Sequence, residues 1–121
     1  MNKKIAVSSP GKLMLLGEHA VVYNHPCIVT AVDQRMRATV EVTSEPFFEL
    51  QAQDVHVTNY KKPMRAVGLG GIPKGAKFVE MAVANLIRNL QLSSKSHEIL
   101  RFAQNDNAGV RITTKSEFSS L

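Results

Sequence analysis

Residues 9–23 read Ser-Pro-Gly-Lys-Leu-Met-Leu-Leu-Gly-Glu-His-Ala-Val-Val-Tyr, a stretch in which apolar runs alternate with Gly and Pro. Pro10 and Gly11 suit the two central positions of a type II turn, because proline presets φ and glycine accepts a positive φ. The apolar residues 5–8 precede this turn and residues 12–16 follow it. The stretch therefore predicts a β-hairpin at the start of the chain.

Three side chains in this stretch carry useful chemistry. Lys12 would lie at the mouth of the hairpin, and Glu18 and His19 follow Gly17 at the opposite end of the returning strand. Glycine lets a ligand approach the backbone closely. An ammonium, a carboxylate and an imidazole on one wall can handle phosphate and alcohol groups. The alternative is a surface lysine and a Glu-His pair that begins a helix, and the residues alone leave both interpretations open.

Further strands are expected on both sides of a single helix. Residues 36–42 and residues 110–114 alternate apolar and polar side chains, which is the period of a half-buried strand. Apolar runs also predict strands at residues 27–32 and 47–52, with another near residues 55–58. The order of strands, helix and strand predicts an α+β sandwich in which the early strands pair antiparallel.

One long helix is predicted between residues 76 and 92, which contain neither Gly nor Pro. An apolar stripe at helical spacing should pack on the sheet, and it consists of Val79, Val83, Leu86 and Leu90, widened by Phe78 and Ala82. Residues 93–108 are mostly polar and predict a surface insertion with a short helical turn. Residues 1–121 are expected to form one domain, or a piece of one.

The composition argues against several classes of protein. The 121 residues are 44% hydrophobic and 21% charged, which suits one packed core and not a disordered chain. No apolar run approaches the roughly 18 residues of a membrane helix, and a signal peptide would lack its hydrophobic middle. We therefore expect a cytoplasmic protein. Cys27 is the single cysteine, so neither an internal disulfide nor a zinc knuckle is expected.

The net charge of +5 arises in the second half of the chain, where residues 61–121 hold 10 basic and 4 acidic groups. The densest stretch has no acid before Glu80 and contains Lys61, Lys62, Arg65, Lys74 and Lys77. A solvated loop is favoured over a nucleic-acid surface, because few aromatic residues interleave with these charges. Salt-sensitive binding would support the alternative, a non-catalytic module that binds phosphate-rich partners.

Two further features look less like functional sites. The Gly-Leu-Gly-Gly sequence at residues 68–71 precedes the helix, but Pro73 follows and supplies no N–H, so a hinge is favoured over a phosphate loop. The remaining histidines are expected to be surface groups, with no metal site. His25 precedes Pro26 in a turn, and His56 and His97 have no nearby cysteine or second histidine at ligand spacing.

The Pro-Gly-Lys and Gly-Glu-His-Ala-Val-Val-Tyr motifs between Pro10 and Tyr23 resemble the first motif of the galactokinase, homoserine kinase, mevalonate kinase and phosphomevalonate kinase (GHMP) superfamily. The residues of these motifs are most similar to those of the mevalonate kinase family. The likeness continues through residues 26–35 and resumes at the helix from Phe78 and at residues 109–115. It implies an α+β domain similar to the second domain of ribosomal protein S5.

The resemblance implies roles for four residues. Lys12 would sit near the acceptor hydroxyl and the transferred phosphoryl group, where its charge favours the alkoxide. Glu18 would orient Lys12 or help to organise the nucleotide end, and His19 would hydrogen-bond the acceptor. Tyr23 would line the same pocket, although a half-buried packing role suits an aromatic residue before a turn equally well.

In this superfamily, the strand that corresponds to residues 110–114 leads to a Gly-Leu-Gly-Ser-Ser type loop that cradles the ATP phosphates. Here residues 116–121 read Ser-Glu-Phe-Ser-Ser-Leu. The cofactor-binding loop, the magnesium ligands and the catalytic aspartate would lie beyond Leu121. The resemblance therefore implies a truncated N-terminal part of an ATP- and Mg²⁺-dependent kinase, and we expect this part to be inactive alone.

The complete enzyme would phosphorylate the primary hydroxyl of mevalonate in isoprenoid precursor synthesis. Its partners would be ATP and the small alcohol, with no membrane partner, and a homodimer is one assembly that the resemblance allows. Phosphomevalonate, homoserine and galactose kinase activities remain open. Galactokinases usually carry Asp after the His of this motif, where the chain has Ala20, and this difference argues against the last of them.

Overall fold

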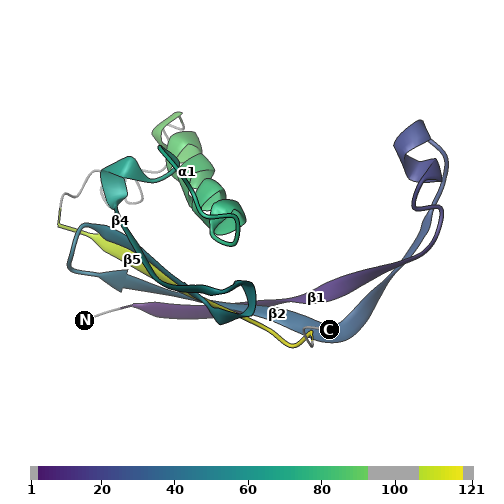
Figure 1. The fold of residues 1–121 in the computed structure, drawn as a ribbon, viewed down its shortest axis with the longest axis horizontal. Helices are drawn as coiled ribbons and strands as arrows, with labels where there is room; N and C mark the ends of the chain where they lie inside the picture. Colours follow the sequence, from purple (N-terminus) through teal and green to yellow (C-terminus); the bar gives the residue numbers. More distant parts are fainter. Residues whose placement is uncertain (1–2, 93–106, 119–121) are drawn as a thin grey trace.

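The computed structural model describes residues 3–92 and 107–118. These residues form a five-stranded sheet in the order β1-β2-β5-β3-β4, with α1 on one face (Figure 1). The strands are β1 (Lys4–Leu16), β2 (Ile28–Thr43), β3 (Phe47–Ala52), β4 (Val57–Pro63) and β5 (Gly109–Ser116). The helix is α1 (Lys77–Leu92), and the short 3-10 turns are η1 (Ala20–Tyr23), η2 (Gln53–Val55) and η3 (Met64–Ala66).

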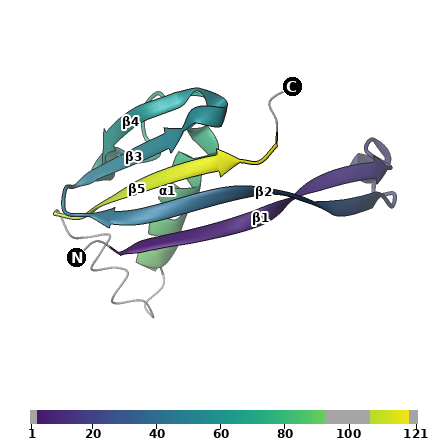
Figure 2. The same ribbon diagram turned by 90° about the horizontal axis from the view of Figure 1, so that it is seen from below.

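β5 comes last along the described chain, yet it lies in the middle of the sheet (Figure 2). It pairs antiparallel with β2 and parallel with β3. β1 pairs antiparallel with β2, and β3 pairs antiparallel with β4. The sheet is therefore mixed. The early antiparallel pairing and the packed helix are confirmed, whereas the likeness to the ribosomal protein S5 domain stays a prediction.

The hydrophobic core lies between α1 and the central part of the sheet. Phe48, Leu50 and Ala52 of β3 are buried and alternate with partly exposed neighbours, as in a strand with one face in the core, and the strand expected at residues 47–52 is confirmed. Val110 and Ile112 of β5 are buried in the same cluster. The other buried apolar members are Val57, Val67 and Ala76.

α1 confirms the predicted helix, but only part of the predicted apolar stripe faces the core. Val79 and Val83 pack against the core cluster, and Glu80 is fully buried between them. Each residue advances by about 100° around a helix, so with Val79 and Glu80 turned toward the core, Phe78 points away from it. Phe78 and Leu86 are 89% and 59% exposed, and the prediction that they pack on the sheet is wrong. Ala82 is exposed as well.

The predicted hairpin around Pro10 and Gly11 is wrong. β1 runs through both residues without turning back, and it pairs with β2 so that Pro10 lies opposite Arg35 and Gly11 lies opposite Val32. The two extra residues of β2, at positions 33–34, form a bulge. β1 is an edge strand, which is where a sheet tolerates a residue without an N–H. Residues that suit a turn therefore lie inside a strand here.

Two other sequence expectations change in detail, and a third lies almost entirely outside the described residues. The runs at residues 27–32 and 36–42 belong almost entirely to a single strand, β2. The weak strand signal near residues 55–58 begins on a 3-10 turn, and β4 extends from Val57 to Pro63. Of the predicted insertion at residues 93–108, all but residues 107 and 108 lie outside the described residues. Among the residues that are described, no helix is long and apolar enough to cross a membrane.

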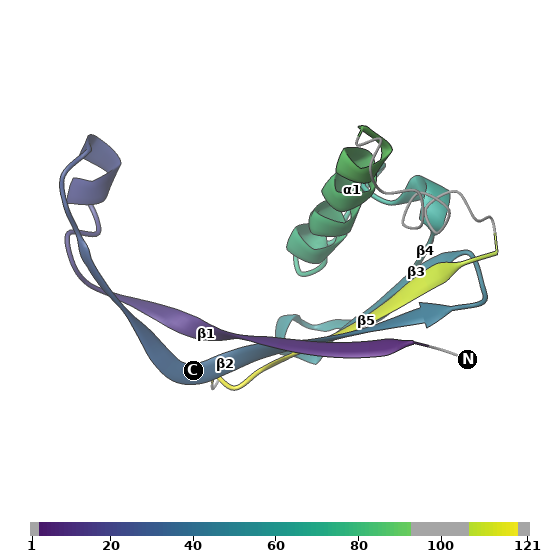
Figure 3. The same cartoon turned by 180° about the vertical axis from the view of Figure 1, so that it is seen from behind.

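We call residues 11–32 the arm. The arm comprises the end of β1, the turn η1 and the start of β2, and it extends well past the other strands (Figure 3). The arm and α1 rise on the same side of the sheet, at opposite ends (Figures 1 and 3). The fold therefore places the first sequence motif on a projecting two-stranded ribbon.

Candidate active site

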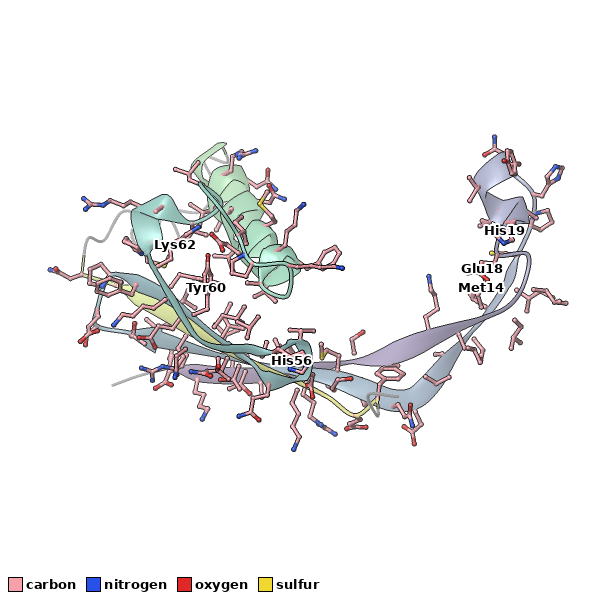
Figure 4. All side chains as sticks on the ribbon, viewed as in Figure 1. Met14, Glu18, His19, His56, Tyr60 and Lys62 are labelled. Atoms are coloured by element: carbon pink, nitrogen blue, oxygen red, sulfur yellow. The ribbon has the colours of Figure 1, made fainter. Side chains whose placement is uncertain are left out.

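The arm carries the four residues to which the first motif assigns a role. Lys12 is exposed and lies inside β1, opposite Ala31 of β2, rather than at the mouth of a hairpin. Glu18 and His19 are exposed in the turn between β1 and η1. Figure 4 shows both of them at the far end of the arm. The structure thus brings an ammonium, a carboxylate and an imidazole onto one ribbon.

Lys12 is separated from the tip of the arm by the rest of β1. The strand rises by about 13 Å between Lys12 and Leu16, because each residue adds about 3.3 Å. Glu18 and His19 follow beyond that point. A ligand that contacts Lys12 and the tip residues together would therefore lie along the ribbon.

Gly17 allows the close approach of the two chain segments at the tip. Its φ is 89°, a left-handed value that favours glycine. A β-carbon at this position would lie 2.8 Å from both the Cα atom of Cys27 and the carbonyl oxygen of Pro26. Any other residue would push these segments apart and move the adjacent Glu18.

Tyr23 ends η1 and is 75% exposed, so the half-buried packing role proposed for its ring is wrong. Val22 beside it is also 75% exposed. The role of Tyr23 in lining a ligand pocket stays a prediction. Its exposure leaves the ring and the hydroxyl accessible to a ligand on the arm.

A buried polar cluster lies at the opposite end of the sheet from the arm, beneath the start of α1. Sequence reasoning missed it. The carboxylate of Glu80 is fully buried and accepts three hydrogen bonds. Tyr60 donates its hydroxyl to Oε2 at 2.7 Å, Lys62 donates from Nζ to Oε1 at 2.6 Å, and Gly68 donates its backbone N–H to Oε1 at 3.0 Å. Tyr60 and Lys62 come from β4 (Figure 4).

The cluster keeps Glu80 ionised. Burial alone would raise the pKa of the Glu80 carboxyl, but the hydrogen bonds from Lys62, Gly68 and Tyr60 outweigh it and lower the pKa below its ordinary value. The hydrogen bond to Glu80 raises the pKa of Lys62 despite partial burial. Burial and the neighbouring carboxylate raise the pKa of Tyr60. The cluster is thus an ion pair with a neutral tyrosine. Its polar groups hydrogen-bond one another.

The Gly-rich sequence at residues 68–71 is tied to this cluster. Gly68 gives its N–H to Glu80, and Lys62 donates a second hydrogen bond to the carbonyl oxygen of Leu69 at 2.6 Å. Gly68 has a φ of 83°, and a β-carbon there would lie 2.7 Å from the β-carbon of Ala84. The loop is therefore bonded to α1 through Gly68 and to β4 through Leu69.

The basic stretch that begins at Lys61 is not a uniformly solvated loop. Lys61 and Lys62 lie on β4, and the side chain of Lys62 is only 14% exposed. Lys61 lies 3.6 Å from a carboxylate oxygen of Glu45, 3.5 Å from one of Glu49, and 4.3 Å from the ring centroid of Phe47. The expectation of a solvated loop is wrong for Lys62. His25 and His56 are exposed, as predicted, and His97 lies outside the described residues.

The described residues do not fit a complete nucleotide or magnesium site. A phosphate cradle uses several free backbone N–H groups, and that of Gly68 already binds Glu80. Within residues 3–92 and 107–118, no three histidine, cysteine or acidic residues gather so as to hold a metal ion. We therefore assign no step to Mg²⁺ through these residues.

Comparison with known sequences finds relatives over part of the chain. No family model matches the chain. It is 39% identical to the mevalonate kinase of Pyrococcus furiosus over 54 residues, which cover 45% of the chain and 16% of that protein. It is 49% identical to the mevalonate kinase of Methanothermobacter thermautotrophicus over 41 residues, which cover 34% of this chain and 14% of that protein. The matches therefore span a small fraction of these relatives.

Solved structures match almost the whole chain. The mevalonate kinase of Methanococcus jannaschii superposes with a TM-score of 0.73 at 21% identity, over 98% of this chain and 34% of that one. The galactokinase of Lactococcus lactis, solved with galactose, superposes with a TM-score of 0.66 at 13% identity, over 98% of this chain and 27% of that one. At these identities, the likeness shows the fold.

The fold therefore defines the class: the chain has a fold that occurs within GHMP kinases and spans about a third of their length. Within this class, the sequence is mevalonate kinase-like. The resemblance seen in the motif of the arm is thereby confirmed. The functional roles of Lys12, Glu18, His19 and Tyr23 stay predictions.

Proposed function

We propose that the chain is the N-terminal part of an ATP-dependent kinase that phosphorylates the primary hydroxyl of mevalonate in isoprenoid precursor synthesis. The main support is the Gly-Glu-His-Ala-Val-Val-Tyr sequence at the tip of the arm, in a chain that resembles mevalonate kinases in sequence and in fold. The complete enzyme would be cytoplasmic, with ATP and a small alcohol as substrates. A homodimer is compatible with this proposal.

Lys12 and Glu18 are the proposed catalytic residues. Phosphoryl transfer depends chiefly on positioning and on neutralising charge, so the ammonium of Lys12 would favour the acceptor alkoxide and offset the charge of the phosphoryl group. Lys12 is exposed on the ribbon and can reach a ligand there. The length of strand between the two residues, about 13 Å to Leu16 alone, argues against direct orientation of Lys12 by Glu18.

His19 and Tyr23 are the proposed acceptor-binding residues, together with Lys12. An imidazole can donate or accept a hydrogen bond, so His19 suits the hydroxyl or the carboxylate of mevalonate. Tyr23 offers an apolar ring and a hydroxyl, which suit a ligand that has both a methyl group and polar groups. Both residues belong to the tip of the arm, so they would act on the same end of the acceptor.

ATP phosphates and Mg²⁺ would be held mainly by polypeptide other than the described residues. Mg²⁺ would supply charge neutralisation at the phosphates when bound. We therefore expect the 121-residue chain to bind the acceptor without phosphorylating it. A coupled ADP-release assay with mevalonate, ATP and Mg²⁺ should give no rate above buffer, and turnover that Lys12→Ala abolishes would contradict this expectation.

Acceptor binding tests the proposal directly. In a titration followed by two-dimensional NMR, mevalonate should cause saturable shifts in the arm of the chain, and Lys12→Met should remove them. Lys115→Met, which removes an exposed charge on β5, is the matched control and should leave binding unchanged. Phosphomevalonate, homoserine and galactose complete the panel. Saturable binding of one of these in place of mevalonate would reassign the substrate, and binding of none would contradict the proposal.

A further inference from the structure

The base of the arm is held by Glu117 and Phe118, the two residues that follow β5. The backbone N–H of Glu117 donates to the carbonyl oxygen of Arg35 at 2.9 Å, and Oε2 of Glu117 accepts the N–H of Arg35 at 3.2 Å. The other carboxylate oxygen lies 2.8 Å from the guanidinium of Arg37. Arg35 is the residue of β2 that follows the bulge. Glu117 thus attaches to β2 where the arm begins.

Arg35 extends this attachment to β1. Its Nε donates to the hydroxyl of Ser8 at 2.9 Å, and a second nitrogen donates to the carbonyl oxygen of Ser8 at 3.3 Å. Ser8 precedes the part of β1 that enters the arm. The two strands of the ribbon are therefore tied together on the sheet side of the bulge.

Phe118 covers the arm side of the bulge. Its ring lies directly over Gly11, so that a β-carbon at residue 11 would overlap Cζ and would come within 2.8 and 2.9 Å of the two Cε atoms. Gly11 is not among the glycines with a positive φ, so its backbone conformation suits other residues. Glycine at this position therefore makes room for the ring of Phe118, and it is the residue immediately before Lys12.

We propose that Glu117 and Phe118 form a clasp that sets the direction of the arm, and that Phe118 is a positioning residue for Lys12. A strand bends and twists at a bulge, and a two-stranded ribbon is only marginally stable by itself. The clasp bonds the sheet side of the bulge through Glu117 and packs on its arm side through Phe118. The consequence for catalysis rests on the proposed function, whereas the clasp itself does not.

A double-mutant cycle tests the contact between Gly11 and Phe118. Gly11→Ala should lower the thermal midpoint by about 4 °C or more, because the added methyl group displaces the ring. In a Phe118→Ala background, the same substitution should leave the midpoint unchanged or raise it, because the ring is absent. An equal decrease in the thermal midpoint in both backgrounds would contradict the contact between Gly11 and Phe118.

Spin-label distances test whether the clasp sets the direction of the arm. One label is placed on the arm through His25→Cys in a Cys27→Ser background, and the other on α1 through Arg88→Cys, since His25 and Arg88 are exposed. The distance distribution should be narrow in the parent chain and at least twice as broad in Phe118→Ala. Phe118→Tyr should restore the narrow distribution, and Lys115→Ala should not change it. Equal widths in the parent and Phe118→Ala would overturn the proposal.

The positioning of Lys12 is read out by ligand affinity. In the mevalonate titration, Phe118→Ala should weaken binding at least fivefold at a temperature where the variant is folded, and Phe118→Tyr should rescue it. Unchanged affinity in Phe118→Ala would overturn the positioning role. If the parent chain fails to bind mevalonate, the proposed function fails, and the distance measurement still decides whether the clasp exists.

Discussion

Nζ of Lys62 lies 2.6 Å from Oε1 of Glu80, and this ion pair joins β4 to α1. The side chain of Glu80 is fully buried and that of Lys62 is 14% exposed. Each charge is stable there because of the other, since an unpaired charge held out of water is costly. The pair also holds the backbone at Gly68 and Leu69, so it fixes the path by which the chain enters the helix.

Removal of one partner of this pair should be strongly destabilising. Lys62→Met leaves the carboxylate of Glu80 buried without its cation and should lower the free energy of unfolding by about 3 kcal/mol. The control is Lys61→Met on the same strand, which removes exposed ion pairs and should cost less than about 1 kcal/mol. Urea denaturation measures both, and similar losses for the two variants would contradict a structural role for the pair.

The same pair should make stability depend on acid pH. The pKa of Glu80 is lowered on folding, so the unfolded chain binds more protons than the folded one below about pH 4.5. The stabilisation is therefore complete above that pH and is lost as the pH falls through the folded pKa. Denaturation curves between pH 6 and pH 3 should show a steeper loss for the parent chain than for Glu80→Gln. Parallel curves would show that Glu80 contributes nothing to the acid transition.

The exposed face of α1 and the core beneath the helix should respond differently to substitution. Phe78 is 89% exposed, so Phe78→Ser should change the free energy of unfolding by less than about 0.5 kcal/mol. Phe48 is fully buried beneath the helix, and Phe48→Ala should cost about 3–5 kcal/mol. Phe78→Ser should also reduce self-association in analytical ultracentrifugation, because it shortens an exposed apolar stripe. A large loss of stability for Phe78→Ser would place that ring in the core.

Alanine substitutions at three glycines should distinguish the cost of a left-handed backbone from the cost of steric overlap. Gly17 has a φ of 89° and close neighbours, Gly70 has a φ of 74° and no atom within 4 Å of an added β-carbon, and Gly71 has neither constraint. Gly71→Ala should be neutral, Gly70→Ala should cost about 1 kcal/mol, and Gly17→Ala should cost more. Chemical denaturation of the three variants checks this order. A neutral Gly17→Ala would contradict the close approach at the tip of the arm.

Local patterns predicted much of the secondary structure. Alternation of apolar residues identified the strand around Val110 and Ile112, because burial on one face imposes a period of two, and an apolar run identified the core strand from Phe47 to Ala52. The helix from Lys77 to Leu92 was predicted because no Gly or Pro interrupts it. These features depend on residues near one another in sequence.

Features that depend on distant residues could not be predicted in this way. Pro10 and Gly11 have the local signature of a turn, but pairing with β2 and the ring of Phe118 decide their conformation. Glu80 lies beside the predicted apolar stripe, and no local signal marked it as a buried charge, because its partners on β4 become neighbours only when the sheet forms. The resemblance located the candidate residues of the arm, whereas their separation along the ribbon required the structure.

The central claim is that Lys12 contacts the acceptor, and the resonance of its side-chain ammonium tests this most directly. In a chain with ¹⁵N-labelled lysine, addition of mevalonate at low temperature should shift the Nζ signal of Lys12 saturably, assigned by its loss in Lys12→Met. The signal of Lys4, exposed at the other end of β1, should stay in place. A Lys12 signal that does not move, or moves no more than that of Lys4, would contradict the account.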